Sequence, residues 1–452
     1  MTSMSKLPDN WAVKPLGEVC KIIKGKKPKD SGSASNERTV PYINIKAFES
    51  GQPVEFAAPG GYPACERDDV LIVWDGARAG LTGRGVSGYI GSTLAKIYSD
   101  AADNRYLFYF LRSQYDQINS RTKGVGIPHV DPSIFNKIPF PIAPLDQQER
   151  IVSEIEKQFS RLDEAVANLK RVKTNLKRYK AAVLKAAVEG KLTEEWRNRQ
   201  KEEGRNIETG EQLLKRILAE RKKKWEEKYP GKKYKEPVGP DMSNLPELPK
   251  GWGWVSLGQI IDEPKYGTSK KCDYKTNGIG VLRIPNIVNE FVDISDLKFA
   301  EFDENEIQTY GLRAGDILTI RSNGSVSLVG KCALVTKSDE KYLYAGYLIR
   351  MRPLGSIVRS EYLMICFSSL SLRKQIESKA KSTSGVNNIN AGELQSLRVP
   401  ICGGDEQEEI VRLVDEKLSS IDYLVLAVEL NLKRAGRLRQ SILIKAFVGK
   451  LI

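Results

Sequence analysis

Two stretches of the chain place apolar residues at steps of three and four, the spacing that gathers them on one face of an α-helix. In the first stretch these positions are Ile151, Ile155, Phe159, Leu162, Val166, Leu169, Val172, Leu176, Tyr179 and Val183. In the second they are Ile410, Val414, Leu418, Ile421, Val425, Val428, Ala435, Leu438 and Ile442, with Asn431 as one polar intruder. Both patterns predict coiled-coil helices, and a single Asn in such a seam fixes the register of the pair.

Both helical stretches carry matching signals at their ends. Asp146 and Asp405 each precede a glutamate by three residues, which predicts an N-cap and a capping box at each helix start. Gly190 and Gly449 stand where a C-terminal glycine cap belongs. A helix over residues 146–189 would be roughly 65 Å long at 1.5 Å per residue. The alternative is that the two helices simply pack inside a bundle.

Ahead of each helical stretch the pattern changes to short β-rich runs that are separated by Gly and Pro. The runs are residues 40–45, 70–74 and 89–98, and later 281–287, 317–320, 331–336 and 347–352. We therefore expect a mixed α/β (α+β) domain before each helix.

The chain repeats itself. Leu7-Pro8-x-x-Trp11 recurs as Leu248-Pro249-x-x-Trp252, a shift of 241 residues. Pro141-Ile142, Asp146 and Gln148-Glu149 recur from Pro400, and Gly190-Lys191-Leu192 recurs from Gly449, both with a shift of 259 residues. Because the second shift holds through the whole helical stretch, that block behaves as an element of fixed length, whereas the β-rich stretch before it varies.

These signals divide the chain into five segments. Residues 1–145 form reader domain 1, residues 146–192 the first helix and residues 193–247 a central region and linker. Residues 248–404 form reader domain 2, and residues 405–452 form the second helix. The central region is rich in charge and proline and predicts a helix over 211–228 followed by an extended linker.

The charge of the chain suggests an acidic polymer as partner. The 452 residues carry a formal net charge of +14, which is the electrostatic footprint of many nucleic-acid-binding proteins. The six cysteines are scattered without a C-x-x-C pair, which argues against a zinc ribbon or a disulfide framework and favours reduced thiols. The polar start of the chain and the lack of a long apolar run predict a cytoplasmic protein that is neither exported nor embedded in a membrane.

Polar residues that can reach DNA lie beside the predicted turns of both reader domains. Arg, Lys and Asn are the residue types that bind guanine and adenine edges or grip phosphate. The candidates in reader domain 1 are Lys24, Lys26, Lys27, Asn44, Lys46, Arg78 and Arg84. Those in reader domain 2 are Lys265, Lys270, Lys271, Arg283, Asn286, Arg321, Asn323, Asn387 and Asn388. Any one of them alone is more simply a solvated surface residue, so the argument depends on their recurrence.

Signals for catalysis are weak by comparison. His129 is the only histidine, which disfavours a histidine metal centre or an imidazole base, and we expect it in a loop or a core. The run from Gly324 to Gly330-Lys331 resembles a phosphate loop, but it has the wrong spacing, and Cys332 replaces the Ser or Thr that binds magnesium. We therefore predict no catalytic, cofactor or metal site in this chain. Two alternatives stay open, a coiled-coil adaptor for proteins and a combined methylase or nuclease with an unfamiliar site.

Taken together, these motifs resemble those of the specificity subunit, HsdS, of type I restriction-modification systems. The segments that carry the resemblance are the Leu-Pro-x-x-Trp starts, the Asp-x-Gln-Glu helix entries, the Gly-Lys-Leu ends, Trp74 to Gly80, and Gly190 to Thr193 with Trp196-Arg197. The resemblance implies that two target recognition domains each read one half of a split, asymmetric DNA site. It also implies that the two helices lie antiparallel and set the unread spacer between the halves.

The resemblance further implies partners and places the cofactors in them. Two HsdM methyltransferase subunits would dock on the chain and bring S-adenosylmethionine. HsdR motor-nuclease subunits would bring ATP and magnesium. The chain itself would be a non-catalytic guide.

Overall fold

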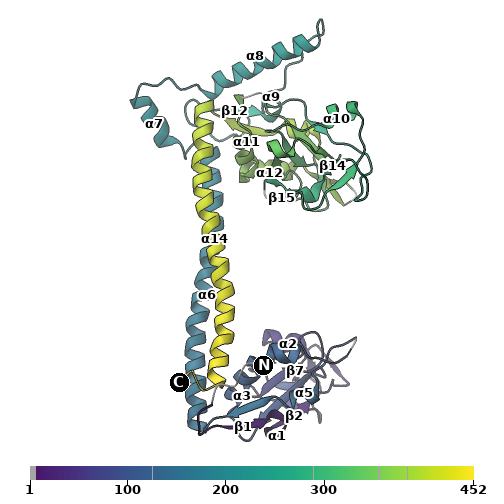
Figure 1. The fold of residues 1–452 in the computed structure, drawn as a ribbon, viewed down its shortest axis with the longest axis vertical. Helices are drawn as coiled ribbons and strands as arrows, with labels where there is room; N and C mark the ends of the chain where they lie inside the picture. Colours follow the sequence, from purple (N-terminus) through teal and green to yellow (C-terminus); the bar gives the residue numbers. More distant parts are fainter. Residues whose placement is uncertain (1–6, 125, 289, 355–356, 384) are drawn as a thin grey trace. The chain divides into compact units, whose positions relative to one another are not determined.

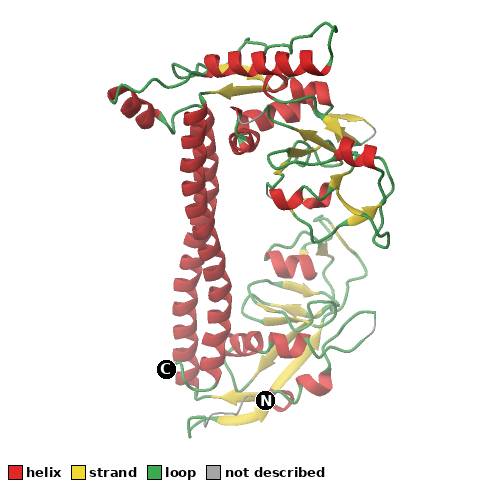
Figure 2. Cartoon of the chain, turned by 45° about the horizontal axis from the view of Figure 1, so that its top comes forward, coloured by secondary structure: helices red, strands yellow, loops and turns green. Residues whose placement is uncertain are grey.

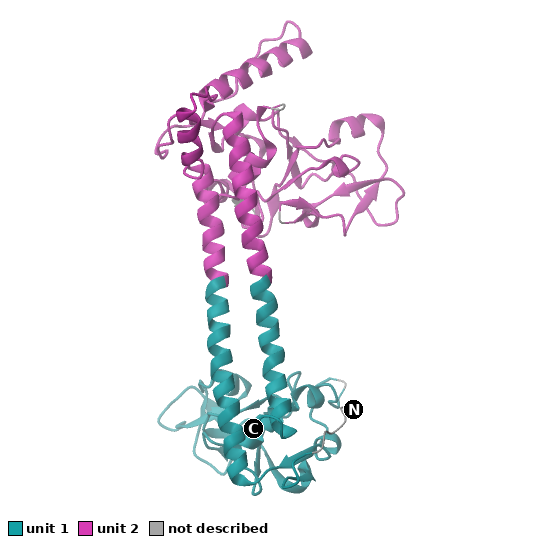
Figure 3. Ribbon diagram, turned by 60° about the vertical axis from the view of Figure 1, so that its left-hand side comes forward, with its two compact units in different colours: residues 1–172, 427–452 teal, residues 173–426 magenta. Residues whose placement is uncertain are grey.

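The computed structural model describes residues 7–124, 126–288, 290–354, 357–383 and 385–452. Residues 1–6, part of the polar start from which we predict a protein that is not exported, lie outside this description. The chain forms two compact units, unit 1 from Met1–Val172 with Ala427–Ile452 and unit 2 from Lys173–Leu426 (Figure 3). Each unit holds one reader domain and part of both long helices.

The two long helices are present as predicted. α6 spans Leu145–Val188 and α14 spans Gly404–Phe447, so the first helix lies within one residue of its predicted ends. Figure 2 shows both as unbroken helices, whereas the strands are confined to the reader domains. In the part of the chain that the structure describes, no helix is both long and apolar enough to cross a membrane.

The two helices pair antiparallel, as the resemblance implied. In unit 2, Lys180 Nζ of α6 lies 3.6 Å from Asp422 Oδ1 of α14. Beyond the end of α6, Thr193 Oγ1 donates a 2.6 Å hydrogen bond to Glu406 near the start of α14. Residue numbers thus rise along one helix as they fall along the other.

The predicted seam is mostly buried, but four of its positions are exposed, namely Val172, Tyr179, Asn431 and Leu438. Asn431 is exposed, and its side-chain amide donates to the Ala427 carbonyl of its own helix at 2.9 Å, so it is not a buried polar residue that fixes register. Leu438 is 51% exposed. Leu432, directly after Asn431, is half-buried instead, and it keeps the steps of four and three between Val428 and Ala435.

The helix starts are also built differently from the prediction. Asp146 and Asp405 lie within the first turn of α6 and α14, because the helices begin one residue earlier, and neither is an N-cap. Gln148 Nε2 donates to the Ala143 carbonyl at 2.8 Å, and the equivalent Gln407 donates to the carbonyl before its own helix at 3.0 Å. A buried glutamine therefore donates a hydrogen bond to a backbone carbonyl at the start of each long helix.

The predicted glycine caps are confirmed, and they show how each unit is closed. Gly190 and Gly449 both adopt a φ of +68°, in the left-handed region. A Cβ on Gly190 would lie 2.7 Å from Pro249, and a Cβ on Gly449 would lie 2.5 Å from Pro8. In each unit, the Gly-Lys-Leu end from one repeat therefore packs on the Leu-Pro-x-x-Trp start of the other.

Reader domain 1 is built from short strands and helices (Figure 1). Its strands are β1 (Ala12–Pro15), β2 (Cys20–Lys24), β3 (Ser31–Gly32), β4 (Val40–Ile43), β5 (Phe56–Ala57), β6 (Ala64–Cys65), β7 (Val70–Val73), β8 (Thr82–Gly83), β9 (Gly88–Ile90), β10 (Leu94–Ser99) and β11 (Pro139–Ile142). Its helices are α1 (Leu16–Val19), α2 (Ile45–Ser50), α3 (Asn104–Ser113), α4 (Tyr115–Asn119) and α5 (Pro132–Phe135).

Unit 2 contains reader domain 2 and the central region. The strands are β12 (Gly253–Ser256), β13 (Lys265–Tyr266), β14 (Ile279–Leu282), β15 (Ile287–Val288), β16 (Phe291–Val292), β17 (Lys298–Ala300), β18 (Ile317–Ile320), β19 (Ser322–Asn323), β20 (Cys332–Leu334), β21 (Leu343–Tyr344), β22 (Leu348–Met351), β23 (Lys381–Thr383), β24 (Val386–Asn388) and β25 (Arg398–Ile401). The helices are α7 (Glu194–Glu202), α8 (Gly210–Lys228), α9 (Leu257–Ile260), α10 (Glu304–Tyr310), α11 (Ser360–Ser368), α12 (Leu370–Lys379) and α13 (Ala391–Gln395), with 3-10 turns at Ile284–Asn286 and Lys337–Asp339.

The two reader domains share one topology. The antiparallel sheet β2-β10-β7-β8 of unit 1 corresponds to β13-β22-β18-β20 of unit 2. The parallel pair β4 and β9 corresponds to β14 and β21. The predicted strand 89–98 is in fact two strands, which are separated at residues 91–93, and the predicted strand 281–287 is interrupted by the 3-10 turn, which contains Pro285.

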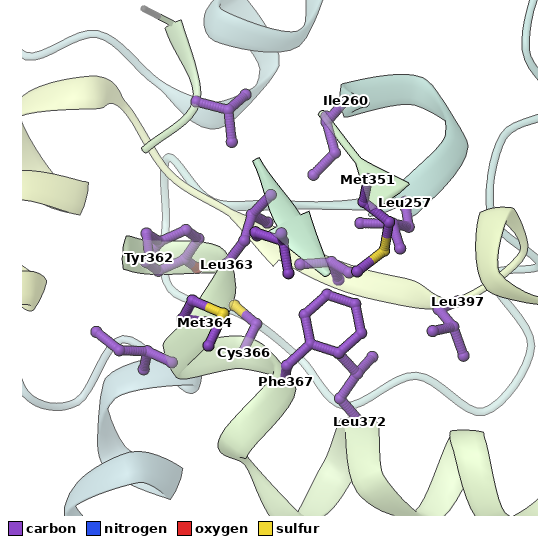
Figure 4. Packing of buried hydrophobic residues seen from close by; sticks show 14 of the residues in the cluster. Leu257, Ile260, Met351, Tyr362, Leu363, Met364, Cys366, Phe367, Leu372 and Leu397 are labelled. Carbon is purple, nitrogen blue, oxygen red and sulfur yellow. The ribbon is translucent and has the colours of Figure 1, made fainter. Parts of the chain in front are cut away.

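The cores show a further repeat that the sequence comparison missed. Tyr106 of α3 donates its hydroxyl to the Pro141 carbonyl at 2.9 Å, and Tyr362 of α11 donates to the Pro400 carbonyl at 3.0 Å. Both tyrosines are fully buried. Figure 4 shows Tyr362 within the core of unit 2, where side chains of α9, α11 and α12 meet. The equivalent helices, α3 in unit 1 and α11 in unit 2, thus hold the segment that leads into the long helix.

Candidate nucleic-acid interface

In unit 2 a three-stranded edge gathers four of the predicted DNA contacts. β19, which follows the central strand β18, pairs with β24, and β24 pairs with β23. Asn387 Nδ2 donates to the Gly324 carbonyl at 3.0 Å, and Arg321 Nε donates to Asn388 Oδ1 at 3.3 Å. Asn323 lies on β19 opposite Asn387. We call this place, with Tyr266, the reading edge of unit 2.

An aromatic ring holds the arginine of this edge. The Arg321 guanidinium lies 4.7 Å from the centroid of the Tyr266 ring, within the range of a cation–π contact. Tyr266 is at the end of β13, and its hydroxyl accepts a hydrogen bond from the Ala391 amide at 3.0 Å. The hydrogen bond at the hydroxyl restrains the Tyr266 ring, and the restrained ring limits the conformations that the Arg321 guanidinium can adopt.

Unit 1 has the corresponding edge with different side chains. Asp75, two residues after the end of β7, forms a β-bridge with His129, and Lys123 bridges His129 from the other side. Lys24 Nζ at the end of β2 lies 5.2 Å from the Trp74 ring centroid. The cation thus comes from the strand and the aromatic ring from the loop, the reverse of unit 2. We call Lys24, Trp74, Asp75, Lys123 and His129 the reading edge of unit 1.

A glycine turn shapes the loop beside each edge. Gly80 and Gly330 have φ values of +95° and +76°, which a side chain rarely adopts. A Cβ would lie 2.8 Å from Ile118 at Gly80 and 2.6 Å from Ile376 at Gly330. The Gly330 run therefore forms a turn ahead of β20 that requires glycine.

Four predicted contact residues are engaged by acidic side chains of their own domain. Arg84 lies 3.0 Å from Asp68, Arg283 lies 3.1 Å from Asp296 and Lys270 lies 2.7 Å from Glu306, while Arg78 forms an ion pair with Glu49. Most of these pairs are partly exposed, so DNA phosphates could compete for the cations. The remaining predicted lysines are exposed, namely Lys26, Lys27, Lys46, Lys265 and Lys271.

Two predicted asparagines have structural roles instead. Asn286 is 1% exposed; its carbonyl accepts from the Arg283 amide at 2.7 Å, and its amide donates to the carbonyls of Asp293 and Asp296. The prediction that Asn286 contacts DNA is wrong for this conformation, because a buried side chain cannot reach a base edge. Asn44 caps α2 by accepting from the Ala47 amide at 3.0 Å.

The sequence reasoning missed Tyr266, Trp74, Lys123 and His129 as members of the two edges. Gly25 and Gly267 offered the signal, because neither position has room for a side chain. A Cβ on Gly25 would lie 2.1 Å from the Gly91 carbonyl oxygen, and a Cβ on Gly267 would lie 2.2 Å from the Tyr344 carbonyl oxygen. Aligning the reader domains on these glycines places Lys24 opposite Tyr266. At this position unit 1 has a cation and unit 2 has an aromatic ring. Similarity of residue type therefore does not reveal that Lys24 and Tyr266 are equivalent.

One carboxylate supports the hairpin of unit 1, which the bridge between Lys123 and His129 closes and whose counterpart in unit 2 is the β23-β24 pair. Asp131 caps α5 and accepts from the Ser133 hydroxyl at 2.7 Å, while Lys123 Nζ lies 3.0 Å away. The Ser133 hydrogen bond, aided by Lys123, lowers the pKa of Asp131 below its usual value of 3.8. In unit 2 the same cap is Asn390, which accepts from the Glu393 amide at 2.9 Å and does not titrate.

Comparison with known proteins places this architecture in a family. The model of the type I restriction modification DNA specificity domain matches residues 8–178 and again residues 249–423. The chain belongs to the type I restriction modification DNA specificity family. The two matches cover both reader domains, most of α6 and the first part of α14. Membership favours DNA recognition over the adaptor and the combined methylase or nuclease that the sequence left open.

Members of the specificity family match along nearly the whole chain. The EcoKI specificity subunit of Escherichia coli K12 is 27% identical, over 99% of this chain and 91% of that protein. The MjaVIII specificity subunit of Methanocaldococcus jannaschii is 23% identical, over 99% and 94%. The HsdS crystal structure from Thermoanaerobacter tengcongensis shares the fold, with a TM-score of 0.55, 20% identity and 99% coverage of both chains. A second solved structure, of a type I restriction-modification system, has a TM-score of 0.66 at 22% identity, over 99% of this chain and 100% of that chain.

Proposed function

We propose that this chain reads a bipartite, asymmetric DNA site, one half with each reading edge. The observation that carries the proposal is that two matched scaffolds present different side chains at equivalent places. Asp75 and His129 occupy the positions of Ser322 and Asn388. Because base discrimination depends on donor and acceptor patterns, different side chains on one scaffold would select different bases.

Within each edge we assign base reading to the held polar groups and phosphate binding to the free cations. Arg321 and the asparagines beside it offer donors that match guanine and adenine edges in the major groove. The exposed Lys26, Lys27 and Lys271 would bind phosphates, which positions the domain without reading sequence. Association with DNA should therefore weaken as salt rises.

We propose that α6 and α14 set the length of the unread spacer between the two half-sites. Each helix is 44 residues long and unbroken, and the repeated motifs at its two ends keep one spacing in both halves of the chain. A rod of fixed length suits this role, because DNA offers equivalent groove positions only at set intervals along its axis.

The partners and cofactors belong to the same proposal. Two HsdM methyltransferase subunits would dock on this chain and HsdR motor-nuclease subunits would join them, all in the cytoplasm. Tyr423 and Leu426 of α14 are 73% and 67% exposed and leave an apolar face within unit 2 on which a partner helix could pack. S-adenosylmethionine would be held by HsdM, and ATP with magnesium by HsdR. We assign no catalytic step to this chain.

Mapping methylated adenines in cells that express the chain with its methyltransferase partner tests the proposal. The expected result is one motif made of two different half-sites around a fixed gap. Inserting one heptad into α6 and one at the facing point of α14 should lengthen that gap by about three base pairs, since seven residues add about 10 Å of helix. A contiguous motif would contradict the proposed reading function. An unchanged gap in the folded insertion variant would contradict the spacer role of the helices.

A further inference from the structure

Unit 2 contains a large cleft that has no part in the reading edge described above. It lies where α8 and the extended segment after it, residues 230–241, face α9, α12 and α13 of reader domain 2. Its volume is about 1540 Å³. This volume exceeds the roughly 300–1,000 Å³ of typical small-ligand pockets.

The cleft is strongly basic. Ten of the residues that line it are Lys or Arg and four are Asp or Glu. Some of the cations have structural roles; Arg352, for example, lies 2.6 Å from the buried Asp316. Others are available: among the residues that the structure describes, no acidic side chain forms an ion pair with the cleft lysines Lys228, Lys232, Lys235, Lys265 and Lys379.

An aromatic cluster organises one wall of the cleft. The Trp225 ring centroid lies 5.4 Å from that of Tyr229 and 5.6 Å from that of Tyr234. Lys228 and Lys232 both lie over the Tyr229 ring, at 5.3 and 5.2 Å from its centroid. The Tyr234 hydroxyl is shielded from solvent and finds no hydrogen-bond partner among the described residues. The aromatic cluster thus restrains Lys228 and Lys232, and it leaves the Tyr234 hydroxyl as an unused hydrogen-bond donor.

The cleft borders the reading edge of unit 2. Lys265 lines the cleft, and the next residue, Tyr266, belongs to the edge. The Tyr266 hydroxyl accepts from the first residue of α13, and Gly392 and Gln395 of the same helix line the cleft. A duplex held at the edge would therefore bring its neighbouring phosphates towards the cleft lysines.

Unit 1 has no equivalent of this wall among its described residues. α8 belongs to residues 193–247, which lie between the two repeats. Any ligand that the cleft holds is therefore bound on the side of reader domain 2 alone.

We propose that this cleft binds the phosphate backbone of duplex DNA that flanks the half-site read by reader domain 2. The inference rests on the proposed function, because it takes the reading edge as the place where DNA lies. Lysines act as point charges that suit phosphate without reading sequence, and their continuity with the edge favours DNA over an acidic peptide of a partner subunit. The anchor would make binding asymmetric, with contact beyond one half-site only.

Two variants with the same charge change test the proposal in the full chain bound to its methyltransferase partner. The cleft variant is Lys228→Gln, Lys232→Gln and Lys235→Gln. The matched control is Lys222→Gln, Lys223→Gln and Lys233→Gln, which come from the same segment but do not line the cleft. Binding of site-containing duplexes is measured against salt, with the flank extended on one side or the other.

The cleft variant should lose the gain in affinity from the flank beside the second half-site. Its negative slope of log affinity against log salt should become shallower by about 2–3, since each phosphate contact contributes about −0.9. The control should keep both. Equal behaviour of the two variants, or loss of the methyltransferase partner in the cleft variant alone, would overturn the proposal, the latter in favour of a protein ligand. The mapped motif should be unchanged in both variants; failure of the unaltered chain to give a bipartite motif would instead count against the proposed function.

Discussion

The two reading edges differ in chemistry although their scaffolds are the same. In unit 1 a strand lysine lies over a loop tryptophan, and in unit 2 a loop arginine lies over a strand tyrosine. The sheets, the glycine turns and the buried tyrosines beneath them correspond pair by pair. The comparison teaches that the fold conserves the place where a cation is held against a ring and leaves its identity free to change. That freedom is what a protein needs to read two different sequences.

The largest expected difference between the units concerns their cores. Phe447, at the end of α14, lies against Tyr106 and Phe110 in unit 1, with ring centroids 5.1 and 5.3 Å apart, whereas the equivalent residue of unit 2 is Val188. Phe447→Ala should lower the free energy of unfolding by about 3–5 kcal/mol. Val188→Ala should cost about 2 kcal/mol, because it removes less buried hydrocarbon. Denaturant unfolding of both variants checks the order, which equal losses would contradict.

A smaller effect should separate the two edges in DNA recognition. Arg321→Ala should reduce discrimination at bases of the second half-site by about 1–3 kcal/mol and leave the first half-site unaffected. Lys24→Ala should do the converse. Competition binding with duplexes that carry single base changes in either half measures both. If either variant altered discrimination at both half-sites equally, the assignment of one edge to one half would be lost.

The smallest predicted effect is on pH dependence. Since its pKa is lowered in the folded chain, Asp131 adds stability above the ordinary carboxyl pKa of 3.8, and this stability is lost as the pH falls through the lowered value. The hairpin of unit 1 should then loosen on acidification more than that of unit 2, whose cap is Asn390. Hydrogen exchange of the two hairpins measures the difference. Asp131→Asn should abolish it, and a difference that persists would show that another group is responsible.

The sequence predicts the repetitive parts of the molecule well. Steps of three and four sustained over many turns leave little choice but a long helix, and a glycine after the last apolar residue marks its end, as Gly190 and Gly449 confirm. The helix starts were harder, because buried Gln148 and Gln407 replace the expected aspartate caps. Nothing in the local sequence pattern distinguishes a glutamine whose side chain hydrogen-bonds to the preceding backbone from one that is exposed to solvent.

The candidate site was only partly predictable, because it depends on contacts between distant segments. Arg321 and Asn388 are brought together by strand pairing that no local signal predicts. Asn286 was misassigned since burial, which decides its role, is a property of the whole domain. The repeat within the reader domains escaped notice because insertions change its shift between Gly25, Tyr106 and Pro141, so only the fold aligns these segments.

Exchanging a reader domain tests the central claim most directly. Replacing residues 248–404 with a second copy of the reader stretch of the first repeat, in a chain that still binds its methyltransferase partner, gives both ends the same edge. Mapping of methylated adenines should then show the first half-site twice around the same gap, with the original second half-site absent. Retention of the original second half-site would show that sequence is read elsewhere than at these edges.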